Sequence, residues 1–176
     1  RDRDDFSGIR RLCKIFSLPT NELEEAAREV MDVDEWMRTF AMYSLCGIGD
    51  TYMQGLEHNN IHYVRPKDNK VLVFPWDMDF AFVRDTTASL WGNGNLARVI
   101  RLPPYMRMYY RHLKDIIETT FNRNYMDRWI DHYGELCDQN FSMVKSYITQ
   151  RANYVLGRLP SSTDFQVTKV DGEEVV

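Results

Sequence analysis

Two short β-prone runs lie in the middle of the chain, and most of the remaining sequence has helical periodicity. The runs are Ile61–Arg65 and Val71–Phe74, separated by the turn-forming stretch Pro-Lys-Asp-Asn-Lys. Helical patterns precede and follow them. The sequence therefore predicts an α+β fold that is predominantly α-helical, with one small β-hairpin in its middle.

Three helices are expected before the hairpin. Apolar residues at helical spacing indicate the first, which Pro19 ends. Asn21 followed by Glu24 has the pattern of a capping box and is expected to open the second helix. Asp34 is expected to cap the third, which glycines at positions 47 and 49 stop. Asp50 then lies just past that stop.

The second half of the chain is expected to be helical as well. Residues 85–95 are polar, contain Trp-Gly-Asn-Gly and predict an irregular loop. Helical periodicity returns after Pro103-Pro104 and continues around Met126–Cys137 and Phe141–Leu159. We therefore expect residues 1–160 to form one helix-rich domain. Residues 161–176 are expected to be a linker or the start of a following domain.

Charge and composition exclude several classes of function. The net charge of −4 does not fit a general nucleic-acid binder, which normally has a basic face. No apolar run approaches the roughly 20 residues that a membrane-spanning helix needs. The cysteines at positions 13, 46 and 137 have no CxxC spacing, so a zinc site is not expected. We expect these residues to be buried thiols instead. The sequence does not decide the oligomeric state.

Four polar residues surround the predicted hairpin. Asp50 precedes it in a glycine-marked loop, Asn60 begins its first strand, and Asp77 and Asp79 follow its second strand. A hairpin folds back on itself, so the residues that enter it and leave it lie near one another. We therefore expect these side chains at the same end of the ribbon.

Oxygen ligands of this kind suit Mg²⁺ or Mn²⁺. A kinase site has the same order along the chain: an aspartate that orients the acceptor hydroxyl, a metal-binding asparagine, and a metal-binding aspartate after a hairpin. Large aromatic residues flank Asp77 and Asp79, and a carboxylate buried in an apolar frame needs a partner. The pattern indicates a divalent metal there, with a pure turn role for Asp50 as the alternative. His58 and His62 are expected to be surface or hydrogen-bonded residues rather than metal ligands.

The stretch from Asp50 to Phe82 resembles the signature of the CotH kinase family, the spore-coat protein H type of atypical protein kinase. That family has a loop aspartate, an asparagine leading a strand, and then a Pro-Trp-Asp-x-Asp segment. Here these are Asp50, Asn60 before Ile-His-Tyr-Val, and Pro-Trp-Asp-Met-Asp. Flanking features extend the resemblance over nearly the whole chain up to Pro160, as the C-terminal half of such a kinase.

The resemblance implies transfer of the ATP γ-phosphate to Ser or Thr of a protein substrate, with Mg²⁺ or Mn²⁺. Asp50 matches the catalytic aspartate and Asn60 the metal-binding asparagine, with Asn59 the alternative if the match shifts by one residue. Asp77 or Asp79 matches the metal-binding aspartate. The family also implies a location outside the cell, at the cell surface or in the spore coat, and a nucleotide-covering lobe upstream. The alternative function is a catalytically inactive, kinase-like adhesion or scaffold protein.

Overall fold

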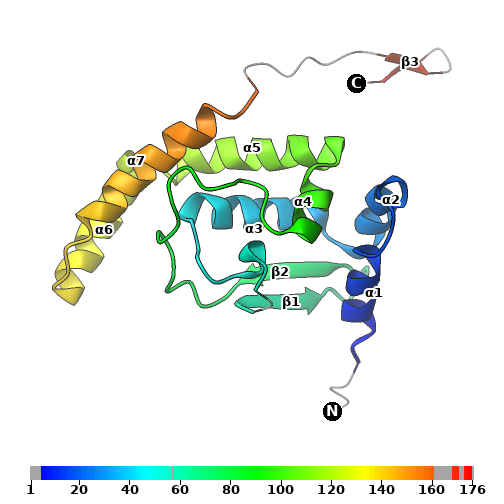
Figure 1. Cartoon of the computed structure of the whole chain (residues 1–176), viewed down its shortest axis with the longest axis horizontal. Coiled ribbons are helices and arrows are strands. Elements are labelled where there is room, and N and C mark those ends of the chain that lie inside the picture. Colours follow the sequence, from blue (N-terminus) through cyan, green and yellow to red (C-terminus); the bar gives the residue numbers. More distant parts are fainter. Residues whose placement is uncertain (1–4, 57, 161–167, 171–172, 176) are drawn as a thin grey trace.

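The computed structural model describes residues 5–56, 58–160, 168–170 and 173–175 (Figure 1). Within these ranges most of the chain is helical, with two short antiparallel hairpins. The elements, in chain order, are α1 (Ser7–Ile15), α2 (Thr20–Val30), α3 (Val33–Cys46), the 3₁₀ turn η1 (Tyr52–Gln54), β1 (Asn60–Val64), β2 (Val71–Pro75), α4 (Gly94–Ile100), α5 (Pro103–Thr119), α6 (Arg123–Cys137), α7 (Ser142–Leu156), β3 (Thr168–Val170) and β4 (Glu173–Val175). The predominantly helical α+β fold predicted from the sequence is confirmed, and so is its central hairpin.

Helix α3 is the centre of the domain. The β1–β2 hairpin lies along one side of it and α5 along the other, while α1 and α2 lie at one end of the domain and α6 and α7 at the other (Figure 1). Trp36, Met37, Phe40 and Ala41 of α3 have no exposed surface. Burial of such side chains is the main free energy that holds the layers together. The helix therefore fixes the position of the hairpin relative to the rest of the fold.

Side chains of α3 also bond the open edge of β2. The indole N–H of Trp36 donates to the Val71 carbonyl at 2.8 Å, and the Glu35 carboxylate accepts from the Val73 N–H at 3.0 Å. The Thr39 hydroxyl lies 3.2 Å from the Val73 carbonyl. An isolated two-stranded hairpin is only marginally stable, and an open edge leaves backbone groups unpaired. These contacts therefore attach the ribbon to the helical body in one register.

Two predicted helix caps are wrong. Helix α2 begins at Thr20 with Pro19 as its N-cap, so Asn21 and Glu24 lie inside the helix and form no capping box. The cap of α3 is Asp32, whose carboxylate accepts from the Glu35 N–H, whereas Asp34 lies in the first turn and pairs with Arg111 and His112. Both errors are shifts of one or two residues, which is the usual uncertainty of a helix boundary.

The polar segment at 85–95 ends in a helix that the sequence did not predict. Asn93 caps α4, since its side chain accepts hydrogen bonds from the N–H groups of Asn95 and Leu96 at 3.0 Å. Gly94 thus begins a helix rather than a loop. The predicted helices after Pro103 are confirmed as α5, α6 and α7, and Gly47 ends α3 with a left-handed backbone, as expected.

Part of the expected linker at 161–176 lies outside the described residues, namely 161–167, 171–172 and 176. The described parts, β3 and β4, pair as a short antiparallel hairpin. The proposed division at residue 160 stays a prediction. In the described part of the chain no helix has the length and apolar character needed to cross a bilayer. The three cysteines are free, and Cys13 and Cys137 are exposed, so the expectation of buried thiols is wrong for these two.

Candidate functional site

Asp50 and Asn59 are in direct contact at the open end of the hairpin. The Asn59 side-chain amide donates to the Asp50 carboxylate oxygen Oδ2 and to the Asp50 carbonyl, both at 2.9 Å. The other carboxylate oxygen, Oδ1, is buried without a hydrogen-bond partner among the described residues. Buried polar atoms are nearly always paired, so an unpaired carboxylate oxygen is a marker of a site that receives a ligand. The residue that contacts Asp50 is therefore Asn59, the alternative to the predicted Asn60.

Tyr43 of α3 contacts the residues that enter and leave the hairpin at its open end. Its hydroxyl lies 2.8 Å from Asn60 Oδ1 and 3.3 Å from the Asn59 carbonyl. Burial raises the pKa of Tyr43 well above its ordinary value, and a hydrogen bond with the backbone of Trp76 opposes this shift. The neutral phenol thus links residues 59 and 60, which enter the hairpin, to residue 76, which leaves it. The helical body in this way positions the polar loops.

Main-chain hydrogen bonds bring the segment after α3 beside the segment after β2. The Gly49 N–H donates to the Phe80 carbonyl at 3.0 Å, and the Arg84 N–H donates to the Gly47 carbonyl at 3.1 Å. Asp50 and Asp79 are the residues that directly flank the Gly49–Phe80 bond. On the hairpin itself, Asn60 pairs with Pro75, two residues before Asp77. The four residues predicted from the sequence therefore lie on segments that meet at one end of the ribbon.

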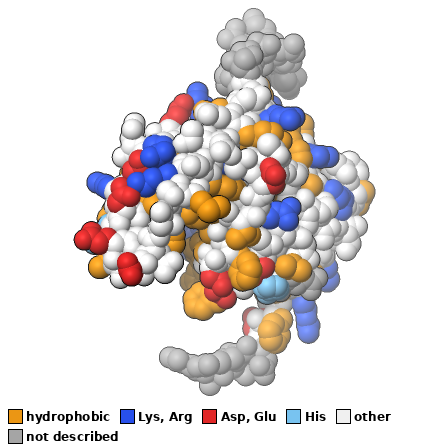
Figure 2. Space-filling model, turned by 60° about the vertical axis from the view of Figure 1, so that its left-hand side comes forward, with side chains coloured by type: hydrophobic (Ala, Val, Ile, Leu, Met, Phe, Trp, Pro, Cys, Tyr) orange, Lys and Arg blue, Asp and Glu red, His pale blue; other side chains and the backbone are white. Residues whose placement is uncertain are grey.

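Asp77 and Asp79 are exposed, which corrects the expectation of buried carboxylates. Their aromatic neighbours are also turned outward: Trp76 is 60% and Phe80 50% exposed. Figure 2 brings the left-hand side of Figure 1 forward and shows hydrophobic side chains gathered there, with acidic groups among them. The aromatic frame therefore does not bury the two aspartates, and burial alone gives no reason for a metal there. The oxygen donors of the site are the feature that fits a metal at this place.

Three residues at the site have a left-handed backbone conformation. Asn59, Asp77 and Phe82 have positive φ values of 60°, 54° and 64°. Asn and Asp tolerate the left-handed region, but a Phe there is a genuine outlier. The hydrogen bond from the Phe82 N–H to the Cys46 carbonyl, at 2.6 Å, holds this residue in place. Strained residues of this kind cluster at active sites and ligand clamps.

A divalent cation fits the donor set, although the protein alone supplies few ligands. Among the described residues, no group of three or more His, Cys, Asp or Glu side chains could hold a metal ion. The available donors are the carboxylates of Asp77 and Asp79, an asparagine amide oxygen and the unpaired Asp50 oxygen. Mg²⁺ in kinase-type sites is bound by one or two carboxylates together with phosphate and water oxygens. This donor set therefore fits Mg²⁺ or Mn²⁺ better than a metal that needs a complete protein cage.

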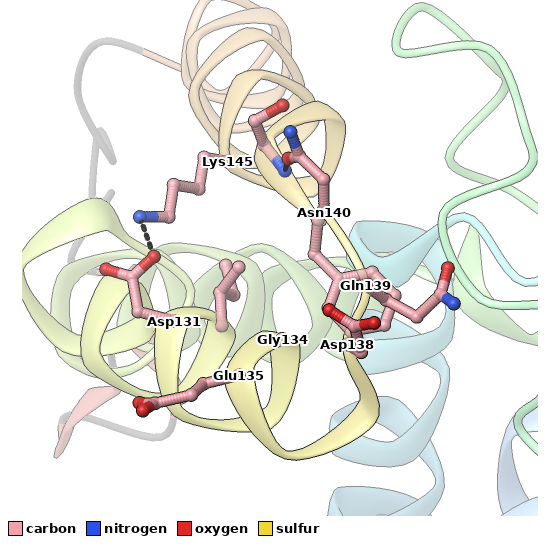
Figure 3. Close-up of a pocket in the computed structure, with 10 residues that line it drawn as sticks. Asp131, Gly134, Glu135, Asp138, Gln139, Asn140 and Lys145 are labelled. Carbon is pink, nitrogen blue, oxygen red and sulfur yellow. Dashed lines mark hydrogen bonds and ion pairs between the residues drawn. The ribbon is translucent and has the colours of Figure 1, made fainter.

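Two other hollows differ in their relation to the predicted site. One lies at the turn between α6 and α7, where Lys145 pairs with Asp131, and it contains none of the predicted residues (Figure 3). The second, of about 480 Å³, is lined by Asn60 together with His58 and His62, but not by Asp50, Asp77 or Asp79. Asn60 therefore borders a hollow that none of the three predicted aspartates lines.

Sequence reasoning missed two residues of the site. Tyr43 lies on a helical face that predicts only core packing, so nothing in the spacing marks its hydroxyl. Thr51 is fully buried and its hydroxyl oxygen has no hydrogen-bond partner in the described residues. Its position directly after Asp50 is the one signal that could have drawn attention to it.

The fold and the site together define a kinase-like chain: a helical body that carries a loop aspartate, an asparagine and a carboxylate pair around one hairpin. The family model described as CotH kinase protein matches residues 2–154. The chain therefore belongs to the CotH kinase family, and the resemblance noted from its motifs is confirmed. A search among curated proteins found no match.

Proposed function

We propose that this chain is the catalytic, metal-binding part of an atypical protein kinase that transfers the γ-phosphate of ATP to Ser or Thr of a protein. Family membership supports kinase-like chemistry in general. The observation that carries the specific proposal is the Asp50 carboxylate, with one oxygen held by Asn59 and the other buried and unpaired. That geometry leaves one carboxylate oxygen without a partner among the described residues, and the proposal assigns the acceptor hydroxyl to it.

Asp50 has the role of orienting the acceptor. Its unpaired oxygen accepts a hydrogen bond from the Ser or Thr hydroxyl and aims the hydroxyl oxygen at the γ-phosphorus. The new oxygen–phosphorus bond forms as the bond from that phosphorus to the bridging oxygen of ADP breaks. The hydroxyl proton passes to the Asp50 carboxylate and from there to solvent. ADP and a phosphorylated protein are the products.

The metal ligands are assigned to Asp77, Asp79 and an asparagine. When bound there, Mg²⁺ or Mn²⁺ would supply positive charge that offsets the negative charge on the phosphate oxygens during transfer. The contacts favour Asn59 over Asn60 for the amide ligand. Asn59 uses its amide N–H group on Asp50, which leaves its side-chain oxygen available, whereas the Asn60 oxygen accepts a hydrogen bond from Tyr43. Asn60 then has the role of holding the hairpin to α3.

The proposal is tested in the full-length protein by following phosphate incorporation from labelled ATP with Mg²⁺ or Mn²⁺. Asp50→Ala is expected to lower the rate at least about a hundredfold, because a positioned proton acceptor contributes roughly 10²–10⁴-fold. Asp77→Ala and Asp79→Ala are expected to raise the metal concentration needed for half-maximal rate. The matched control is Asp115→Ala, an exposed aspartate on α5 outside the site.

Unchanged phosphate incorporation in both Asp50→Ala and Asp77→Ala would refute the residue assignment. The alternative, an inactive kinase-like adhesion or scaffold protein, predicts no incorporation by the wild type under any metal. Hydrolysis of a model phosphate ester without ATP would instead indicate a metal-dependent phosphoesterase. Thermal unfolding of each variant checks that a lost rate is not a lost fold.

A further inference from the structure

An apolar groove begins at the candidate active site and runs along α6. It has a volume of about 520 Å³ and is lined on one side by Met78, Asp79, Ala81 and Phe82 and on the other by α6, with Phe141 and Val144 completing it. Among the described residues that line it, Asp79 is the only charged one. The same aspartate is a proposed metal ligand, so whatever occupies the groove lies directly beside the transferred phosphate.

The α6 wall of the groove presents aromatic rings to solvent. Tyr125, Trp129 and Tyr133 follow one another at i, i+4 spacing, and Trp129 and Tyr133 are 39% and 55% exposed. The Trp129 and Tyr133 rings are stacked, with their centroids 6.3 Å apart. The Arg128 guanidinium lies 5.0 Å from the Trp129 ring centroid and 5.2 Å from that of Tyr125. A row of rings that is ordered in this way but left uncovered is typical of a binding surface.

The chemistry of the walls distinguishes between the ligands that such a site could receive. A nucleotide base needs hydrogen-bond partners for its edge. The α6 wall is helical, so its backbone N–H and C=O groups are bonded within the helix and do not face the groove. A large apolar side chain needs only the apolar contact that these rings provide. Apart from the Asp79 carboxylate, the two tyrosine hydroxyls and the Trp129 indole N–H, the lining side chains are apolar, so the walls favour an apolar side chain over a base.

We propose that this groove binds a large apolar or aromatic side chain of the acceptor protein, a few residues from the phosphorylated Ser or Thr. The inference rests on the proposed kinase function and adds a substrate preference to it. Asp50 directly follows Gly49, whose N–H bonds the Phe80 carbonyl, and the neighbours of Phe80, Asp79 and Ala81, line the groove. An acceptor hydroxyl held at Asp50 is therefore close to the start of the groove. Trp129 and Tyr133 are thus specificity-determining residues.

The first test measures phosphate transfer by the full-length protein to serine peptides. The peptides carry one Phe, placed in turn at each position up to about four residues from the serine, which an extended chain spans in roughly 13 Å. At one or more positions, Phe is expected to raise kcat/KM about tenfold over Gly, through a lower KM. Trp129→Ala and Tyr133→Ala are expected to abolish that preference and leave the KM for ATP unchanged.

The matched control is Leu136→Ala, on the same helix, because Leu136 is 68% exposed but does not line the groove. A second test does not depend on turnover: calorimetry measures the binding of every peptide of the Phe series, with Ala in place of the acceptor serine, and the tightest binder is carried forward. Trp129→Ala is expected to weaken that binding about tenfold and Leu136→Ala to leave it unchanged.

Three results would overturn the inference while leaving the proposed kinase activity standing. In the first, both groove variants keep the peptide preference and the peptide affinity of the wild type. In the second, the main effect of these variants is a raised KM for ATP. In the third, the wild type is a dimer that Trp129→Ala dissociates. Absence of phosphate transfer by the wild type would contradict the kinase proposal instead. The calorimetric comparison would still decide whether the groove binds the peptide.

Discussion

The helical body and the open end of the hairpin are built in different ways. In the body, α3 buries its apolar face completely between β2 and α5, and helix ends carry recognisable caps such as Gly47. At the open end of the hairpin, Trp76 and Phe80 are exposed, and Asn59 and Asp77 have left-handed backbones. The body is held by side-chain packing, whereas the site is held by hydrogen bonds between distant main-chain segments.

This difference indicates how stability and function are divided in the chain. Packing in the body is spread over many side chains, each of which contributes to stability. The site depends on a few individual contacts, among them the bonds from Tyr43 to residues 59 and 60 and from Gly49 to Phe80. We therefore expect substitutions to separate into two groups: those that change stability and those that change activity on an intact fold.

The largest effect on stability is expected at Arg151, a buried residue of α7 that joins the body to the loop after the site. Its guanidinium donates to the carbonyls of Ser44, Thr86 and Ala88, at 2.7–3.1 Å. Burial lowers the pKa of this guanidinium. Arg151→Met removes all of these hydrogen bonds and leaves the partly buried Thr86 and Ala88 carbonyls without this donor, so the free energy of unfolding is expected to fall by about 3 kcal/mol. Urea unfolding measures the change.

Arg158→Met is the matched control for that substitution. The guanidinium groups of Arg158 and Arg151 both lie over the Tyr154 ring, at 4.9 Å and 5.6 Å from its centroid, but Arg158 is exposed. We expect a change of less than about 0.5 kcal/mol. An equal loss in the two variants would show that stacking on Tyr154, rather than the carbonyl contacts, accounts for the stability, and the distinction between body and loop would fail.

The next prediction compares the two asparagines at the start of β1. Asn59→Gly keeps the left-handed backbone that Asn59 has, but removes its contact with Asp50. Phosphate transfer is expected to fall by roughly ten- to a hundredfold, with little change in stability. Asn60→Ala removes the partner of Tyr43 and is expected to cost about 1 kcal/mol of stability while activity is kept. Reversed results would assign the metal-binding role to Asn60.

The smallest effect is expected at the turn of the hairpin, far along the ribbon from the site. Arg65 bonds both carboxylate oxygens of Asp68, and this holds the pKa of Asp68 down at about 2. A carboxyl whose pKa is lower in the folded than in the unfolded state stabilises the fold above the unfolded pKa. Its contribution is lost as the pH falls from about 3.8 towards 2. Asp68→Asn is therefore expected to lower the unfolding midpoint slightly at pH 6 and not at pH 2.

A midpoint that Asp68→Asn lowers equally at both pH values would indicate a packing effect rather than a charge effect. Phosphate transfer by this variant is expected to match that of the wild type, because the turn lies at the opposite end of the hairpin from Asn60 and Pro75. A reduced rate would mean that the turn and the site are coupled through the ribbon.

The sequence predicted the helices and the hairpin because their signals are local. Apolar spacing, Gly47 and the paired β-prone runs each depend on a few neighbouring residues. The predicted caps at Asn21 and Asp34 were wrong because several capping residues compete within one turn. The helix that begins at Gly94 was missed because its cap, Asn93, is part of a polar stretch that also fits a loop.

The candidate site was predicted in outline and not in detail. The order of Asp50, the asparagines and the aspartates after the hairpin is a local pattern, and the structure brings their segments together. The exposure of Asp77 and Asp79 could not be read from their aromatic neighbours, because an aromatic side chain can face either the core or solvent. Tyr43 contacts two residues that lie 16 and 17 positions further along the chain, and no periodic pattern in the sequence predicts such a contact.

The antiparallel ribbon has its functional residues at one end and the turn Pro66–Lys70 at the other. Residues added in pairs at the turn extend both strands away from Asn60 and Pro75 without changing the register at the open end. An insertion of odd length in one strand would instead reverse which face its side chains occupy. The turn is thus the natural place for related chains to vary in length, and for a reporter sequence to be inserted with the site left in register.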